Sequence, residues 1–170
     1  ENMEHDACGV GLVVSTEGKK SRKVVEAGIE ALKAVWHRGA IDADGKTGDG
    51  AGIHLEIPSD FFVEKIEVTG HTHDNSELCV GMIFLPRNDY GAQEACRTIV
   101  ESELTKNNFN IYGWRQVPVN PSVLGEKAEQ TRPEITQILF KHNNKKLKDK
   151  ELNRSLYETR RIIEKQASSN

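Results

Sequence analysis

Apolar side chains recur along the chain at spacings that predict both helices and strands. Between residues 21 and 37 they return every three or four positions, as on one face of an amphipathic helix. Ser21 can cap the start of this helix, and Gly39 follows its end. Residues 93–106 predict a second helix and residues 149–166 a third. These segments form the helical part of the expected fold.

Five shorter segments are rich in residues that favour strands. The predicted strands cover residues 8–14, 53–57, 78–85, 109–117 and 134–140. The first begins at Cys8 and is expected to be buried, and a polar, glycine-dense loop at 40–50 leads into the second. Because strands and helices alternate, the pattern predicts a mixed fold but does not choose among the arrangements open to such a fold.

Length and charge limit the classes of protein to which the chain can belong. Its 170 residues are enough for one ordinary domain, or for the front of a larger one. The net charge of -3 gives no electrostatic basis for binding nucleic acid or an anionic membrane. The apolar runs are shorter than the roughly 18 residues that span a bilayer. The acidic start of the chain does not resemble a secretory signal, so a cytoplasmic or organelle-stromal location is expected.

The cysteines at positions 8, 79 and 96 form no Cys-x-x-Cys pair, which argues against a disulfide framework. Cys8 is followed by Gly9 and Gly11, which leave room for a ligand or a second backbone. No histidine follows in a thiol-protease-like motif. The α-amino group of an amino-terminal cysteine, however, has a pKa of about 7.7 to 8.0 and can serve as the general base. Cys8 is therefore a candidate nucleophile, and the alternative is a small buried apolar residue.

Two further motifs lie between the first predicted helix and the second predicted strand. Trp-His-Arg-Gly-Ala occupies residues 36–40, and Thr-Gly-Asp-Gly-Ala-Gly-Ile occupies residues 47–53. Together with Cys-Gly-Val-Gly at residues 8–11, they resemble the amidotransferase domain of glutamate synthase large subunits in both sequence and spacing. Other matching stretches extend the resemblance over nearly the whole chain: residues 57–62, 80–86, 113–119 and 122–125.

The resemblance implies an amino-terminal-nucleophile (Ntn-type) glutamine amidotransferase with an α+β fold, a four-layer α-β-β-α sandwich in which two antiparallel sheets stack between helices. Residues 1–7 would be a leader, and residues 8–170 would form the amino-terminal portion of the domain. The family's nucleophile matches Cys8, which would become the first residue and attack the side-chain amide of L-glutamine, releasing glutamate and ammonia. Arg38 and Gly39 match the family's Arg-Gly pair and are expected to bind substrate beside the nucleophile.

By the same resemblance, the parent enzyme passes ammonia to 2-oxoglutarate at an FMN and iron–sulfur site in another part of the protein. Nothing in these residues predicts a site for either cofactor. The expected partners are L-glutamine and the remaining synthase domains or subunits. A metal site is not expected, because His71, His73 and Asp74 offer too few ligands in a polar loop.

The sequence also departs from the family's pattern. The residues before Cys8 block its α-amino group as written. The family's Arg-Phe-Ser-Thr-Asn-like segment and its oxyanion-stabilising Asn-Gly pair do not occur in this sequence. The loss of one oxyanion donor typically costs about 2.7 to 4 kcal/mol of transition-state stabilisation. We therefore expect an amino-terminal fragment of the domain whose activity, taken alone, is very weak.

Two other functions are open at this point. A non-catalytic structural or regulatory remnant of the fold would explain the uncleaved leader and the missing oxyanion pair. A different amidotransferase of the same superfamily, forming phosphoribosylamine or asparagine, fits less well with the motifs at residues 47–52 and 113–118. For Arg38 itself, the alternative to a role in the site is a surface charge just beyond a helix, able to meet the last carbonyls there.

Overall fold

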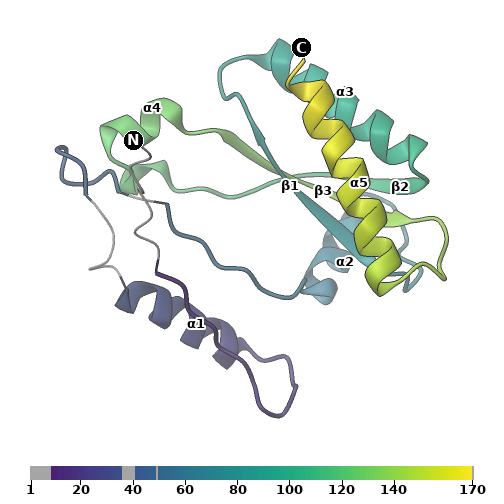
Figure 1. Cartoon of the computed structure of the whole chain (residues 1–170), viewed down its shortest axis with the longest axis horizontal. Coiled ribbons are helices and arrows are strands. Elements are labelled where there is room, and N and C mark those ends of the chain that lie inside the picture. The colour runs from purple at the N-terminus through teal and green to yellow at the C-terminus, as the bar shows by residue number, and fades with distance from the viewer. Residues whose placement is uncertain (1–8, 36–40, 49, 170) are drawn as a thin grey trace, which may run out of the picture. The chain divides into compact units, whose positions relative to one another are not determined.

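The computed structural model describes residues 9–35, 41–48 and 50–169, and these divide into two compact units (Figure 1). The first unit contains the described residues up to Glu56 together with the segment 120–131. The second unit contains residues 57–119 and 132–169. The first unit is therefore discontinuous in sequence.

The second unit is built on a three-stranded antiparallel sheet in the order β1-β3-β2. Its strands are β1 (Leu78–Leu85), β2 (Phe109–Gln116) and β3 (Glu134–His142). The central strand β3 pairs with β1 on one side and β2 on the other, so that Phe140 lies between Cys79 and Ile111. Residues 136–140 of β3 are consecutively buried, which shows that both faces of the sheet are covered along this stretch.

Two helices cover one face of the sheet and one helix covers part of the other. They are α2 (Ser59–Val68), α3 (Tyr90–Lys106) and α5 (Asp149–Ala167). Figure 1 shows α3 and α5 side by side. Leu104 of α3 and Leu152 of α5 pack in one buried cluster with Ile138 and Phe140 of β3. A Cβ placed on Gly81 of β1 would lie only 2.8 Å from Cγ2 of Ile138, so glycine is needed for this close packing.

The opposite face of the sheet is covered by α2 at one end only. Phe62 and Ile66 of α2 pack against Leu139, and Leu78 and Tyr112 belong to the same cluster. Alternate residues of a strand share a face, so the side chains of β1 at positions 82 and 84 lie on the same face as Leu78. These two, a methionine and a phenylalanine, are 49% and 64% exposed. This face therefore keeps an exposed apolar area beyond α2.

The first unit contains helix α1 (Arg22–Ala34), the short 3-10 turn η2 (Pro121–Val123) and helix α4 (Glu126–Thr131). Ser21 caps α1, since its hydroxyl accepts from the Val24 backbone N–H at 3.4 Å. None of the residues of α1 is fully buried. In the part of the chain that the structure describes, no helix combines the length and the apolar character needed to cross a bilayer.

The structure confirms a mixed helix-and-sheet fold and most of the predicted elements. The strands predicted at residues 78–85, 109–117 and 134–140 are present as β1, β2 and β3. The helices predicted at 93–106 and 149–166 are α3 and α5, and α1 occupies the described part of the helix predicted at 21–37. Helix α2 was not predicted.

The strands predicted at residues 8–14 and 53–57 are wrong for the described residues. Residues 9–14 and 50–58 form no strand, and Val10 and Leu12 are 93% and 87% exposed. A strand is stabilised by hydrogen bonds to a neighbouring strand, and among the described residues no other segment pairs with either of these two. Their β-forming composition alone does not produce a strand.

Replacing Ile138 by alanine should destabilise the second unit, because this side chain is 1% exposed and its removal leaves a cavity between the sheet, α3 and α5. We expect a loss of about 2 to 5 kcal/mol in the free energy of unfolding, measured by urea denaturation. Val68→Ala, at a position that is 80% exposed, is the control and should change stability by less than about 0.5 kcal/mol. Equal losses in the two variants would contradict the proposed core.

Cys79 should resist alkylation in the folded protein. Burial, and to a smaller extent the negative charge of Glu77, raise the pKa of its thiol to about 12. The thiolate is the reactive form, so at pH 8 the folded protein keeps this thiol protonated as well as inaccessible. Peptide mapping after iodoacetamide treatment should find Cys79 modified only in urea, and the half-buried Cys96 modified earlier. Labelling of both at the same rate in the folded protein would contradict this expectation.

Candidate functional site

The residues that the sequence assigns to the site, Cys8, Arg38 and Gly39, lie outside the described residues. Among the described residues, Gly9 directly follows Cys8, and Val35 and Ile41 are the nearest in sequence to Arg38 and Gly39; all three belong to the first unit. The contacts of these flanking residues show which parts of the first unit lie close together.

The residue after Cys8 lies against the carboxyl end of α1. A Cβ placed on Gly9 would lie 3.4 Å from Cβ of Val35, which is ordinary van der Waals contact. Val35 is the last described residue before the Trp-His-Arg-Gly-Ala motif, three positions before Arg38. The structure thus brings the flank of the Cys8 motif next to the flank of the Arg38 motif.

The segment that follows the Thr-Gly-Asp-Gly-Ala-Gly motif also contacts α1. A Cβ placed on Gly28, in the middle of the helix, would lie 3.3 Å from Cδ1 of Ile53. Helix α1 and its cap are therefore approached by Gly9, which follows Cys8, and by Ile53, which follows the Thr-Gly-Asp-Gly-Ala-Gly motif. In the sequence, α1 is followed by the Trp-His-Arg-Gly-Ala motif.

A tight turn connects the second motif to the third. Ile41 and Gly48 form an isolated antiparallel bridge, and the Asp42 backbone N–H donates to the Thr47 carbonyl at 2.7 Å. The turn is completed by Gly45, whose N–H donates to the Asp42 carbonyl at 3.0 Å and whose φ of +69° is readily adopted by glycine. We call residues 41–48 the motif hairpin.

The Asp44 carboxylate stabilises the turn of the motif hairpin by accepting hydrogen bonds. Its Oδ1 accepts from the backbone N–H groups of Lys46 and Thr47 at 2.9 and 2.6 Å, and its Oδ2 accepts from the Thr47 hydroxyl at 2.5 Å. These hydrogen bonds, led by that of the Thr47 hydroxyl, hold the pKa of the Asp44 carboxyl well below its usual range. Asp44 is thus an ionised acceptor within the turn rather than a free acid or base.

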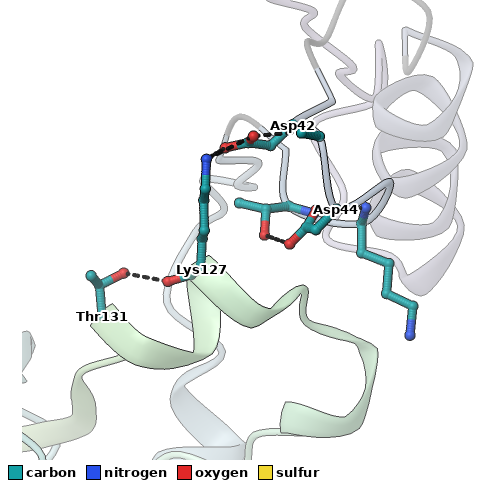
Figure 2. A network of polar contacts seen from close by, with 7 residues as sticks. Asp42, Asp44, Lys127 and Thr131 are labelled. Carbon is teal, nitrogen blue, oxygen red and sulfur yellow. Dashed lines mark hydrogen bonds and ion pairs between the residues drawn. The ribbon is translucent and has the colours of Figure 1, made fainter.

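The segment 120–131 docks onto the motif hairpin within the first unit (Figure 2). Gly125 is buried, and a Cβ at this position would overlap the Thr47 hydroxyl oxygen and Oδ2 of Asp44. Two residues further on, Nζ of Lys127 donates to both carboxylate oxygens of Asp42 at 2.8 and 2.7 Å. The sequence reasoning missed this contact and used residues 122–125 only as a stretch of family resemblance.

The histidines considered as metal ligands lie in the second unit and have local partners. Nδ1 of His73 lies 3.1 Å from the Tyr112 hydroxyl oxygen, and Nδ1 of His71 lies 3.1 Å from the Thr69 hydroxyl oxygen. In the described ranges, no group of three or more histidine, cysteine or acidic side chains is placed to hold a metal ion.

Asp74, the carboxylate beside these histidines, forms ion pairs with two lysines. Its Oδ2 lies 2.7 Å from Nζ of Lys141 on β3 and 2.7 Å from Nζ of Lys145. These lysines, together with the Ser76 hydroxyl, hold the pKa of the Asp74 carboxyl well below its usual range. Asp74 therefore anchors the loop before β1 to the sheet.

The chain matches the family model for class-II glutamine amidotransferases over residues 8–170. It is 58% identical over 162 residues to the glutamate synthase [NADPH] large chain of Azospirillum brasilense, a match that covers 95% of this chain and 11% of the relative. It is 38% identical over 167 residues to the chloroplastic ferredoxin-dependent glutamate synthase 2 of Arabidopsis thaliana, covering 98% of this chain and 10% of the relative.

A third relative gives the same result. The ferredoxin-dependent glutamate synthase 2 of a Synechocystis strain is 39% identical over 163 residues, covering 95% of this chain and 10% of that protein. The chain thus spans about a tenth of the length of the curated relatives that it matches. The match to the family model covers nearly every residue, including the motifs around Cys8 and Arg38. The chain therefore belongs to the class-II glutamine amidotransferases.

Proposed function

We propose that this chain is the glutaminase part of a glutamate synthase and releases ammonia from L-glutamine. The observation that carries the proposal is the extent of the family match, which begins at Cys8, the position that the resemblance gives to the nucleophile. The names of the relatives support glutamate synthase as the parent enzyme, since these proteins are NADPH- and ferredoxin-dependent glutamate synthases.

In the proposed mechanism, removal of residues 1–7 frees the α-amino group of Cys8. This amine accepts the thiol proton while the sulfur attacks the side-chain carbonyl carbon of glutamine. The proton then passes to the departing nitrogen, so that ammonia leaves and a thioester remains on Cys8. Water, activated by the same amine, hydrolyses the thioester, and glutamate and the free thiol are restored. No histidine is required in these steps.

We assign the binding of glutamine beside the nucleophile to Arg38 and the backbone of Gly39. The contact between Gly9 and Val35 supports this assignment, because it places the neighbours of the two motifs together in the first unit. The motif hairpin supports it further, since its bridge begins at Ile41, two residues after Gly39.

We also propose the four-layer α-β-β-α sandwich for the complete domain. In the second unit, α3 and α5 already form a helical layer on one face of an antiparallel sheet. The other face exposes Met82 and Phe84 beyond α2. An apolar sheet face is normally covered by another layer, and a second sheet packed there would complete the sandwich.

The parent enzyme would transfer the ammonia to 2-oxoglutarate with the help of FMN and an iron–sulfur cluster, and we assign both cofactors to parts of the protein outside this chain. An iron–sulfur cluster is held by cysteine thiolates. Cys79 fits this role poorly because its thiol is buried in the core and stays protonated. The partners of the chain would be L-glutamine and the remaining synthase domains or subunits, in the cytoplasm or an organelle stroma.

The 170 residues taken alone should hydrolyse glutamine much more slowly than the natural protein. The oxyanion-stabilising Asn-Gly pair of the family is not in this sequence. Without such a donor, the charge that develops on the carbonyl oxygen of glutamine lacks part of its stabilisation.

The nucleophile can be tested by treating the natural protein with 6-diazo-5-oxo-L-norleucine, a diazoketone analogue of glutamine. We expect the amino-terminal peptide to start at Cys8, to gain one adduct, and to be protected by glutamine. Cys8→Ala should abolish the adduct and the release of ammonia, whereas the control Cys96→Ser should keep both. A peptide that still carries residues before Cys8 and never reacts would favour a non-catalytic remnant of the fold instead.

A further inference from the structure

An irregularity in β2 determines on which face of the sheet the side chain of Arg115 lies. The pairing of β2 with β3 is regular up to Ile111 and shifts by one residue before Gly113. Arg115 therefore pairs with Gln137 and lies on the face that carries α2, whereas Trp114 packs in the cluster with α3 and α5. With an unbroken register the arginine and the tryptophan would exchange faces.

Two neighbours hold the guanidinium of Arg115 on this face. Its Nη1 donates to Oε1 of the buried Gln137 at 2.7 Å. The guanidinium carbon also lies 5.2 Å from the centre of the Phe61 ring on α2. A guanidinium has five N–H donors in a planar fork, and among the described residues the other donors have no hydrogen-bond partner. The arginine is thus fixed in place but keeps donors for a further acceptor.

The surroundings of Arg115 are apolar and exposed. Met82 of β1 and Arg115 of β2 flank Gln137 of β3, so the three form one row across the sheet. Met82, Phe84 and Phe61 are 49%, 64% and 39% exposed. We call Phe61, Met82, Phe84 and Arg115 the open sheet face.

The charge of Arg115 restricts what can cover the open sheet face. A layer packed on the exposed apolar side chains would also take the guanidinium out of water, at a cost of several kcal/mol if its charge stays unpaired. The amide of Gln137 accepts one hydrogen bond but carries no charge that balances the arginine. A carboxylate balances the charge and can accept two parallel N–H groups from one guanidinium. Charge complementarity therefore selects a layer that carries an acidic side chain.

We propose that the open sheet face docks the second sheet of the natural protein, and that an aspartate or glutamate of that sheet pairs with Arg115. This inference rests on the four-layer sandwich put forward under the proposed function. The apolar side chains supply the buried area, and the arginine sets the register. A strand displaced by one residue would turn its carboxylate away from the guanidinium.

The test measures how fast hydrogen peroxide oxidises Met82 in the natural protein, by peptide mapping at early times. If the second sheet covers this side chain, oxidation should be much slower in the folded protein than in urea. Arg115→Met leaves the acidic partner buried without its cation, so oxidation should become about 10-fold faster or more. Arg154→Met is the control, because it removes an exposed ion pair with Glu158 on α5 and should leave the rate unchanged.

The structure of the natural protein identifies the partner of Arg115. We expect a carboxylate oxygen of the second sheet within hydrogen-bond distance of the guanidinium. Replacing that acidic residue by leucine should also speed the oxidation of Met82. Combining this change with Arg115→Met should restore slow oxidation, because no charge is then left unpaired. Arg115→Lys keeps the charge without the planar fork and should give an intermediate rate.

Alkylation of Cys79 separates loss of the sheet contact from unfolding, because this thiol lies in the core on the other side of the sheet. It should stay resistant to iodoacetamide in Arg115→Met. If Cys79 reacts as well, the double variant decides: restored protection of both side chains supports the pair, and continued labelling contradicts it.

Three results would overturn the inference. The first is oxidation of Met82 in the folded wild-type protein at the rate found in urea, which would also remove the support for a second sheet. The second is slow oxidation that Arg115→Met does not change. The third is a structure in which no carboxylate reaches Arg115. None of these results bears on glutamine hydrolysis, which is measured separately as ammonia release, and loss of that activity alone would overturn only the proposed glutaminase function.

Discussion

The fold of the second unit depends on the two-sided hydrogen bonding of strand β3. Its backbone groups pair with β1 on one edge and β2 on the other, so its polar atoms are satisfied while its side chains are buried on both faces. Helices α3 and α5 can then cover one face and α2 part of the other. Without both neighbours, burying β3 would leave unpaired peptide groups in an apolar interior, at a cost that packing would not offset.

The first unit satisfies its backbone in a different way. Its motif hairpin has a single bridge, and the Asp44 carboxylate accepts the backbone N–H groups of Lys46 and Thr47 within the turn. Lys127 pairs with the side chain of Asp42 and adds no backbone hydrogen bond. With one isolated bridge, the hairpin lacks the repeated strand pairing of a sheet. This arrangement ties the conformation of a glycine-rich motif to a small number of polar contacts.

Sequence periodicity predicted the elements whose partners are present in the described structure. Residues 78–85 became β1 because β3 lies beside them, whereas residues 9–14, with a similar composition, have no partner among the described residues and are exposed. Helix α2 was missed because it buries only Phe62 and Ile66, too few positions to establish a helical period, and starts directly after Pro58. Local spacing cannot show whether a partner strand exists.

The residues of the candidate site were identified from sequence motifs rather than from the periodicity of apolar residues. Cys8, Arg38 and Gly39 were selected by their resemblance to a family, and the match over residues 8–170 shows that family, while the roles of these three residues stay a prediction. The contact of Gly125 and Lys127 with the hairpin could not be derived from one sequence, since nothing local to either segment signals a partner some 85 residues away.

The discontinuity of the first unit also has a consequence for its synthesis on the ribosome. When the motif hairpin emerges, the segment that will hold it has not yet been made, and the 63 residues from Ile57 to Val119 must be translated first. Closing a loop of this length costs chain entropy before any contact compensates for it, which slows the ordering of the hairpin. Residues 57–119 are released earlier than their own partners at 132–169, so neither unit can finish folding from its first stretch alone. The first unit can therefore be completed once the chain has passed Thr131, and the second only after β3 and α5 have been added.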